Sequence, residues 1–223
     1  MWHILNILQK YTPKTIRDIG CGSWRCLPVF QENLSHAFSY TAVDFSPSFI
    51  ELARQSVNES ASHTFICKDM LGFMQEQDSQ STEAIVGLAS IQHLFSHQER
   101  ARFFVESYRT LAYWGTLILV NRSFSDRFLR SYTSACLQAL LYRVFSLGLK
   151  WRNDVFIPRK DANHQKNKQV FSRFYHIFML TELERYALQA WFAIEELCYI
   201  DNSWQKTSRR RNARNSFLVA RKM

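Results

Sequence analysis

The sequence is poor in glycine, with 6 Gly among 223 residues, whereas an average protein has about 7%. It also lacks a long apolar run, because residues 134–149, the most apolar helical stretch, are interrupted by Gln138 and Arg143. The N-terminus does not show the basic, apolar and small-residue order of a signal peptide. These absences exclude a collagen-like chain, and they lead us to expect a protein that does not span a membrane.

The cysteines show no sequence pattern that joins them. None of the five stands in a C-x-x-C motif, and their odd number argues against a disulfide framework. We therefore expect neither a disulfide scaffold nor a metal site, and a reducing cytoplasmic location. The five residues are Cys21, Cys26, Cys67, Cys136 and Cys198.

Acidic residues are scarce in the last third of the chain. Residues 151–223 hold 14 Lys and Arg against 7 Asp and Glu, whereas residues 1–150 hold 14 against 12. The net charge of +9 is therefore concentrated toward the C-terminus. A positive surface attracts polyanions, so nucleic acid is a reasonable partner, although the same charge could serve only solubility.

Apolar residues make up 47% and charged residues 21%, as in an ordinary globular protein. In the first half of the chain, segments with the periodicity of strands alternate with segments of helical periodicity. The expected strands are residues 15–19, 39–43, 64–67, 84–90 and 116–120, and the expected helices are residues 2–10, 46–57 and 98–111.

The pattern changes after residue 122. Residues 123–150 predict a helical insertion, and residues 151–170 are polar and poorly periodic, as in a mobile loop. A helix near residues 180–190 follows, and strands at residues 193–200 and 216–220 can pair as an antiparallel hairpin at the sheet edge.

This alternation predicts an α/β fold with a Rossmann-like, doubly wound sheet of about seven strands, of which the last is antiparallel. The length fits one domain over residues 1–223. Its expected parts are a ligand-binding half (1–122), an insertion and substrate-side loop (123–178), and a C-terminal helix and hairpin (179–223).

A glycine turn follows the first expected strand. Gly20 and Gly22 precede a helical segment, and a backbone without Cβ lets a nucleotide-like ligand approach the N-terminus of that helix. Asp44 ends the next strand, where its carboxylate can accept hydrogen bonds from both hydroxyls of a ribose. Asp69 ends the third strand, where it can meet an adenine amino group. Their coincidence with strand ends favours a bound nucleotide-like cofactor over solvated carboxylates.

Over roughly residues 14–121, the sequence resembles the class I S-adenosylmethionine (SAM)-dependent methyltransferases. The segments that carry the resemblance are residues 18–23 (DIGCGS), 43–47 (VDFSP), 68–70 (KDM) and 90–94 (SIQHL). It implies that the glycine turn lines the methionine part of SAM, that Asp44 holds the ribose and that Asp69 and Met70 flank the adenine. Residues 90–93 would then lie beside the transferred methyl group. The cofactor residues implied are Asp18, Gly20, Cys21, Gly22, Asp44, Phe45, Asp69, Met70, Ser90 and Gln92.

A narrower resemblance lies after the fifth expected strand. Residues 154–158 (DVFIP), residues 171–178 (FSRFYHIF) and the pair Glu182-Leu183 are similar to the C-terminal part of tRNA methyltransferases that esterify a carboxymethyl group on the wobble uridine. The resemblance implies tRNA as substrate and a small activating protein subunit, which some tRNA methyltransferases have. Alternatively, the aromatic residues of this segment are core and His176 is a satisfied buried imidazole.

The tRNA hypothesis has a physical logic. A carboxylate is ionised at neutral pH, so it needs no general base, and catalysis reduces to aligning its oxygen with the sulfonium methyl group. Arg173 could orient the carboxylate, with Arg25 or Arg122 as alternatives, and His93 and Tyr175 complete the candidate catalytic set. A basic turn near the C-terminus would contact RNA phosphates, unless it is only a solvated run. The arginines of this turn are Arg209, Arg210, Arg211 and Arg214.

Two other hypotheses stay open. The same cofactor chemistry could act on a small molecule, with residues 151–170 as a lid over a compact pocket. The chain could also be a catalytically silent partner protein in which Trp24 blocks the cofactor site.

Tryptophan stands where the methyltransferase motifs have glycine. Trp24, Trp114 and Trp191 occupy such positions, and Trp151 and Trp204 also lie in loop-like surroundings. An indole at position 24 would obstruct the cofactor. The codon UGA is read as tryptophan in some genetic codes and as glycine in others. Our hypothesis is that these tryptophans come from translation with the wrong code and that the native protein has glycine there.

Overall fold

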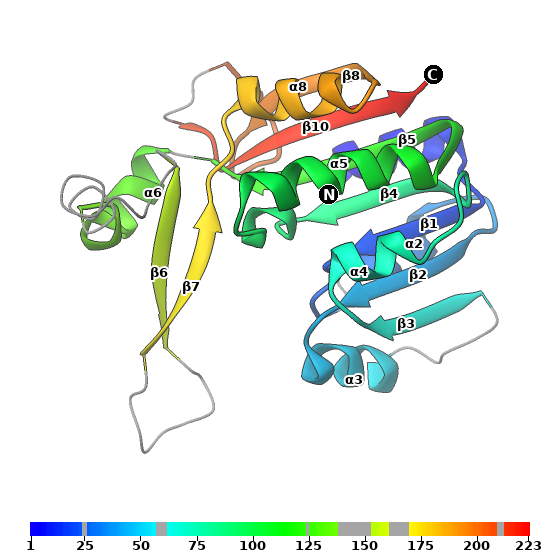
Figure 1. Ribbon diagram of the computed structural model, residues 1–223, viewed down its shortest axis with the longest axis horizontal. Helices are drawn as coiled ribbons and strands as arrows, with labels where there is room; N and C mark the ends of the chain where they lie inside the picture. Colours follow the sequence, from blue (N-terminus) through cyan, green and yellow to red (C-terminus); the bar gives the residue numbers. More distant parts are fainter. Residues whose placement is uncertain (24–25, 57–61, 124, 138–152, 161–169, 209–211) are drawn as a thin grey trace.

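The computed structural model describes the chain except for residues 24–25, 57–61, 124, 138–152, 161–169 and 209–211. A central sheet of eight strands carries helices on both faces (Figure 1). Its strands are β1 (Thr15–Ile19), β2 (Ser39–Asp44), β3 (His63–Cys67), β4 (Thr82–Leu88), β5 (Leu111–Arg122), β8 (Phe192–Ile200), β9 (Lys206–Thr207) and β10 (Asn215–Lys222).

The helices that cover this sheet are short. None in the described part of the chain is long and apolar enough to cross a membrane. They are α1 (Trp2–Tyr11), α2 (Cys26–Asn33), α3 (Pro47–Ser56), α4 (Met70–Gln75), α5 (His97–Thr110) and α8 (Leu180–Gln189), with a 3-10 turn η1 (Ile91–His93) after β4.

The strands follow the order β3-β2-β1-β4-β5-β10-β8-β9. Strands β1 to β5 pair in parallel, and β10 runs antiparallel to both β5 and β8. The predicted Rossmann-like sheet with an antiparallel last strand is therefore confirmed. The last two long strands pair antiparallel on this side of the sheet as expected, with β10 next to β5 and β8 beyond it. The two-residue strand β9, which the sequence pattern did not indicate, brings the sheet to eight strands.

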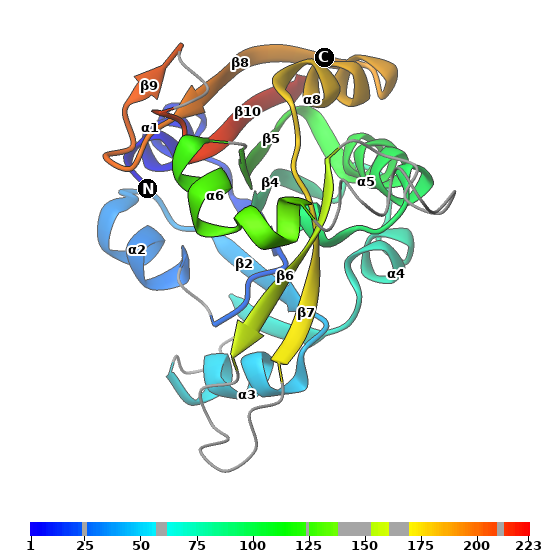
Figure 2. The same cartoon turned by 90° about the vertical axis from the view of Figure 1, so that its left-hand side faces the viewer.

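Two apolar clusters sandwich the sheet, because successive side chains of a strand point to opposite faces. On β5, Ile118 and Val120 belong to the cluster that α1, α2 and α3 close, whereas Leu117 and Leu119 belong to the cluster beneath α4, α5 and α8. Figure 2 shows α1 and α2 on one side of the sheet and α4, α5 and α8 on the other. The period-two pattern of the strands thus specifies both layers.

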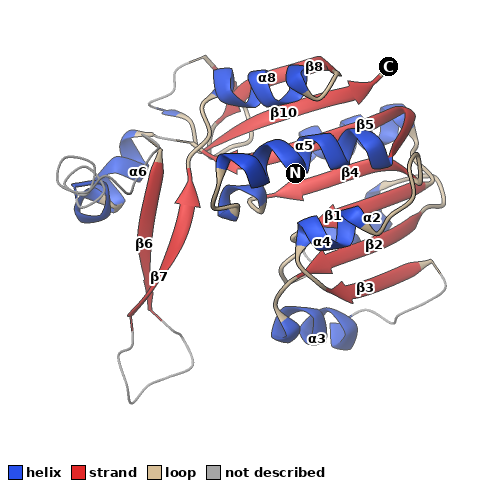
Figure 3. Cartoon of the chain, viewed as in Figure 1, coloured by secondary structure: helices blue, strands red, loops and turns tan. Residues whose placement is uncertain are grey.

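A second sheet is built from the segment that we expected to be a loop. Strands β6 (Asp154–Lys160) and β7 (Val170–His176) form an antiparallel pair in which Val155 faces Tyr175 and Ile157 faces Arg173. The expectation of an irregular loop over residues 151–170 was wrong for β6, because Val155 and Ile157 are buried at alternating positions. The hairpin stands beyond the carboxyl ends of β2, β3 and β4 (Figure 1, Figure 3).

The insertion after β5 is helical where the structure describes it. Helix α6 (Asp126–Ser131) begins at Ser125, whose hydroxyl accepts a hydrogen bond from the Phe128 amide at 3.1 Å, and residues 133–137 are also helical. The rest of the predicted helical insertion, residues 138–150, lies outside the described residues.

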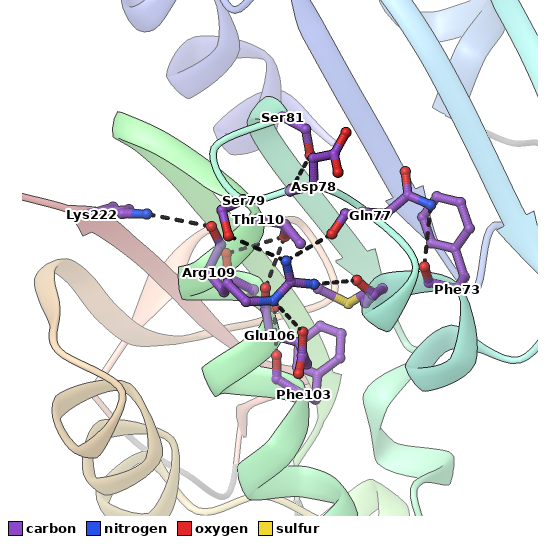
Figure 4. Close-up of polar contacts among 12 residues, drawn as sticks. Phe73, Gln77, Asp78, Ser79, Ser81, Phe103, Glu106, Arg109, Thr110 and Lys222 are labelled. Atoms are coloured by element: carbon purple, nitrogen blue, oxygen red, sulfur yellow. Dashed lines mark hydrogen bonds and ion pairs between the residues drawn. The ribbon is translucent and has the colours of Figure 1, made fainter.

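Arg109, near the end of α5, makes hydrogen bonds close to the amino-terminal ends of the parallel strands (Figure 4). Its guanidinium donates hydrogen bonds to the carbonyl oxygens of Met74 at 2.8 Å and Gln77 at 2.7 Å, and to the Glu106 carboxylate at 2.8 Å. A cation near the end of α4 satisfies carbonyl groups that have no partner within the helix. Arg109 therefore fixes the turn that leads into β4, on the edge opposite the candidate site.

Candidate active site

The turn after β1 lies very close to the turn after β4. Gly20 and Gly22 have φ angles of 75° and 58°, a left-handed conformation that favours glycine. The Gly20 amide donates a hydrogen bond to the Val43 carbonyl at 2.7 Å. A Cβ atom on Gly20 would lie 2.4 Å from the Cβ of Ser90, whereas a Cβ on Gly22 would meet no atom within 4 Å. The first glycine thus allows contact between the turns, and the second faces open space.

Asp44 joins the ends of β1 and β2. Its carboxylate is 7% exposed and accepts hydrogen bonds from the Gly22 amide and the Ser46 amide, each at 2.9 Å. Each carboxylate oxygen can accept more than one hydrogen bond, so capacity for a ligand hydroxyl remains. The predicted pairing of the acid at position 44 with the glycine turn is present in the fold.

Two more polar groups are buried beside this turn. The Ser90 side chain is 4% exposed, and its hydroxyl has no hydrogen-bond partner among the described residues. Asp18 is also buried, and it accepts a hydrogen bond from the Tyr40 hydroxyl at 2.5 Å. Burial raises the pKa of Asp18 to about 6, although hydrogen bonds from Tyr40 and Cys26 act in the opposite direction. A buried hydroxyl without a partner is costly, and a bound ligand would remove that cost.

Gly20, Gly22, Asp44 and Ser90 together form what we call the cradle. Other predicted cofactor residues lie just after the ends of β1, β2 and β3. Asp69 is the N-cap of α4, where its carboxylate accepts a hydrogen bond from the Gly72 amide at 2.7 Å. Met70 is half-buried, and Phe45 is 70% exposed directly after the end of β2. Cys21 is buried, and burial raises the pKa of its thiol, which favours the neutral form.

Gln92 has a structural contact that the sequence did not predict. Its side-chain oxygen accepts a hydrogen bond from the Arg122 amide at 2.9 Å, so it ties η1 to the end of β5. The Gln92 side chain is 2% exposed. This contact fixes the segment that carries Ser90 and His93.

The β6–β7 hairpin lies against η1 and forms a wall beside the cradle. An imidazole nitrogen of His93, Nδ1, lies 2.8 Å from the carbonyl oxygen of Phe174, and the His93 ring meets the Tyr175 ring edge to face with centroids 4.6 Å apart. Phe174 also contacts Phe95 and Phe156, with ring centroids at 4.8 and 5.6 Å. The fold therefore brings two of the three predicted catalytic residues, His93 and Tyr175, into contact.

Arg173, the third predicted catalytic residue, precedes Tyr175 by two positions on β7, so both project from the same face of the strand. Its side chain is half-buried. Phe95 and Phe156 also belong to this wall, although no sequence motif placed them there. The alternation of residues 154–157 was a signal for a strand, but only the fold shows that Phe156 faces Phe174.

Several predicted residues lie outside the described part of the chain: Trp24, Arg25, Arg209, Arg210 and Arg211. Arg214 is exposed, and its backbone connects the end of β8 to the end of β5 through hydrogen bonds to Ile200 at 2.8 Å and from Ser123 at 3.3 Å. Among the residues that the structure describes, no group of His, Cys, Asp and Glu side chains could hold a metal ion.

Comparison with known proteins agrees with this geometry. Residues 16–115 match the family model of a methyltransferase domain. No curated protein matches the chain significantly. A SAM-dependent methyltransferase from Methanosarcina mazei is similar in structure, with a TM-score of 0.70 and 19% identity over 97% of each chain.

Two further solved structures are similar at lower identity. The 1,6-didemethyltoxoflavin-N1-methyltransferase of Burkholderia thailandensis, which contains S-adenosylhomocysteine, has a TM-score of 0.60 and 14% identity, over 98% of this chain and 76% of that chain. The complex of the Haloferax volcanii Trm112 methyltransferase activator with a protein described as a methyltransferase gives 0.60 and 13%, over 93% of this chain and 81% of that chain. The chain thus matches a methyltransferase-domain family over residues 16–115 and has, over nearly its whole length, the fold of SAM-dependent methyltransferases.

Proposed function

We propose that the protein transfers the methyl group of SAM to a carboxymethyl group on the wobble uridine of tRNA. The methyltransferase domain and the fold account for the methyl donor. The observation that carries the choice of acceptor is the position of β7. This strand belongs to the segment that resembles tRNA carboxymethyl methyltransferases, and it contacts η1 through His93.

The cradle fits SAM at three points. Gly22 faces open space next to the turn, the buried carboxylate of Asp44 can accept from ribose hydroxyls, and the Ser90 hydroxyl has no partner among the described residues. Asp69 and Met70 would flank the adenine at the end of β3. When bound, SAM supplies an electrophilic methyl group whose bond to sulfur breaks as the acceptor oxygen attacks, leaving the electron pair on sulfur.

The hairpin residues supply orientation on the acceptor side. An acceptor carboxylate is ionised at neutral pH, with an unperturbed pKa of about 4, so no side chain needs to remove a proton. Arg173 can donate two parallel hydrogen bonds to such a carboxylate and fix one oxygen for in-line attack. His93 and Tyr175, in contact with each other, would form the neighbouring wall and exclude water.

The basic C-terminal third supports an RNA acceptor, because 14 cationic residues against 7 acidic ones attract phosphates. The Haloferax volcanii neighbour is bound to a methyltransferase activator. We therefore include a small activating subunit among the proposed partners of this chain.

The deciding experiment is incubation of the protein with labelled SAM and total tRNA from its host, followed by nucleoside analysis. We expect label in the ester of a carboxymethylated uridine, released by mild alkali. The assay is run with and without small host proteins that are purified on the immobilised chain, because an activating subunit would raise the rate.

A matched pair of variants tests the role of Arg173. Arg173→Gln should lower ester formation by roughly 100-fold, since a charge-assisted contact contributes about 1.5–3 kcal/mol. Arg102→Gln, which removes an exposed arginine from α5, should leave the rate unchanged. Label found only in a tRNA-free metabolite fraction would replace this proposal with a small-molecule acceptor.

A further inference from the structure

A polar cavity lies between the end of β5, helix α6, the end of β8 and the start of β10. Its volume is about 720 Å³, within the range that small ligands occupy. The residues that line it are mostly polar or charged: Arg122, Ser125, Phe128, Arg130, Ser131, Tyr132, Asp201, Asn202, Ser203, Asn212, Ala213 and Arg214.

The charge of this lining is positive. Arg122, Arg130 and Arg214 contribute three guanidinium groups, whereas Asp201 contributes one carboxylate. That carboxylate is already engaged, because its Oδ1 accepts hydrogen bonds from the amides of Ser203 at 2.8 Å and of Gln205 at 3.0 Å. Three arginines around one cavity suit a ligand with several acceptor oxygens and negative charge.

A backbone hydrogen bond connects the lining of the cavity to the candidate active site. The Arg122 amide donates to Gln92, which holds the segment of Ser90 and His93. The Arg214 backbone bonds to Ile200 and Ser123, so the third arginine is fixed to the same strand ends. An anion in this cavity would therefore be held at a defined position relative to the acceptor group.

We propose that this cavity is a phosphate subsite for the RNA acceptor, in which Arg122, Arg130 and Arg214 hold a phosphodiester group of the nucleotide chain. The inference rests on the proposed function, since it takes RNA as the acceptor. Arginine binds phosphate bidentately, which favours a phosphate group as the ligand. RNA is favoured as its source because Tyr132, half-buried beside Phe128 with ring centroids 5.0 Å apart, is one of the lining residues and could stack with a base.

The test compares equilibrium binding of unmodified tRNA by the full chain and three variants, at several salt concentrations. Arg130→Gln and Arg214→Gln should each weaken binding roughly tenfold and reduce the slope of log affinity against log salt by about one. Arg102→Gln, on the outer face of α5, is the matched control and should change neither quantity. SAM affinity, measured by calorimetry, should be the same in all four proteins.

The outcomes separate this subsite from the proposed function. The phosphate subsite is overturned if the wild-type protein does not bind tRNA. It is also overturned if Arg130→Gln and Arg214→Gln lower tRNA affinity no more than Arg102→Gln does, even when tRNA is methylated. If both cavity variants weaken tRNA binding but the protein forms no methyl ester on tRNA, the subsite is supported and only the acceptor chemistry is overturned.

Discussion

Asp44 shows how much one side chain can contribute to a site of this kind. It is buried, it follows directly from the β2 register, and two backbone amides hold its carboxylate over the glycine turn. Because both amides come from the chain itself, the carboxylate is oriented before any ligand arrives. Such preorganisation lowers the entropic cost of binding.

We expect Asp44→Asn to weaken SAM binding by roughly 100-fold, because the amide keeps the shape but loses the charge that strengthens hydrogen bonds to ribose hydroxyls. Titration calorimetry measures the effect, and Glu51→Gln, an exposed change on α3, is the control. Equal SAM affinity in the Asp44→Asn variant and the wild type would show that the cofactor lies elsewhere.

Three of the tryptophans that the coding hypothesis concerns have a left-handed backbone, the conformation that favours glycine: two at positions where the methyltransferase motifs have glycine, Trp114 and Trp191, and the loop residue Trp204. Trp114, Trp191 and Trp204 have φ angles of 65°, 69° and 61°, so three of the four tryptophans that the structure describes are left-handed. Trp191 is 80% exposed and Trp114 is 59% exposed, so packing does not offset the strain. A side chain in this conformation costs about 1–2 kcal/mol. The finding supports the hypothesis that the native protein has glycine at these positions.

Replacing Trp191 with glycine should therefore raise the free energy of unfolding by about 1 kcal/mol. Trp2→Gly is the control: Trp2 is 74% exposed but begins α1 with ordinary helical backbone, so its loss should give no gain. Urea denaturation measures both variants. Mass spectrometry of the protein from its host is the direct check, and tryptophan found at positions 114 and 191 would contradict the coding hypothesis.

At the scale of elements, the β6–β7 hairpin is anchored by a buried imidazole. His176 ends β7; its Nδ1 lies 2.6 Å from Asp154 on β6 and its Nε2 lies 2.9 Å from Glu182 on α8. Burial lowers the pKa of His176, but the two hydrogen bonds to carboxylates outweigh burial and raise it above its ordinary value. The nearby cation Arg100 opposes that rise. The interpretation of His176 as a satisfied buried imidazole agrees with these contacts.

This anchor makes the stability of the hairpin depend on pH. Because the folded pKa of His176 exceeds its ordinary 6.5, the stabilisation is complete below that value and declines as the pH rises through the folded pKa. His176→Gln should cost roughly 3 kcal/mol at mildly acidic pH, below the ordinary pKa of His176 and above the pKa of Glu182, which burial raises but the contact with His176 lowers overall. In this window the substitution leaves two buried carboxylates without the cation between them, and the cost should be smaller in alkali. Urea denaturation of both proteins across the pH range tests this. A cost that stays constant with pH would mean that His176 is neutral.

The residues near His176 also connect the hairpin to the main sheet. Arg100 on α5 is fully buried and donates hydrogen bonds to the carbonyls of Leu94 at 2.8 Å and Phe95 at 3.2 Å. Phe95 contacts Phe174 of β7. The wall beside the proposed acceptor site is thus supported from α5, α8 and β6 together.

At the scale of the whole molecule, the last strand completes both cores. Phe217 and Val219 of β10 belong to the cluster beneath α1 and α2, and Leu218 and Ala220 belong to the opposite cluster. Strand β10 also pairs with β5 along its length. We therefore propose that residues 1–223 behave as one domain, although the methyltransferase family model ends at residue 115.

One cooperative unfolding transition is expected from the full chain, by calorimetry and circular dichroism alike. A fragment of residues 1–122 should be insoluble or show no cooperative unfolding transition. Without β10, strand β5 would expose the edge that β10 covers in the full chain, together with two apolar surfaces. Two separate transitions in the full chain, or a fragment that melts cooperatively, would divide the chain into two domains.

The sequence by itself determined the parallel half of the molecule. The glycine turn, the acids at strand ends and the alternation of β1 to β5 are local patterns, since each reflects backbone conformation or period-two burial within a few residues. Asp44 and Gly22 could be paired in advance because equivalent ends of parallel strands meet at one edge of the sheet.

Tertiary structure alone decided how the residues of the proposed acceptor side are arranged. The contact of His93 with β7, the Asp154–His176–Glu182 anchor and the arginines around the cavity join residues far apart in the chain, and no periodicity encodes which of them meet. Strand β6 was mistaken for a loop because its short, basic run includes Pro158 and pairs with only one partner strand. Its identity as a strand comes from that partner, which local sequence does not specify.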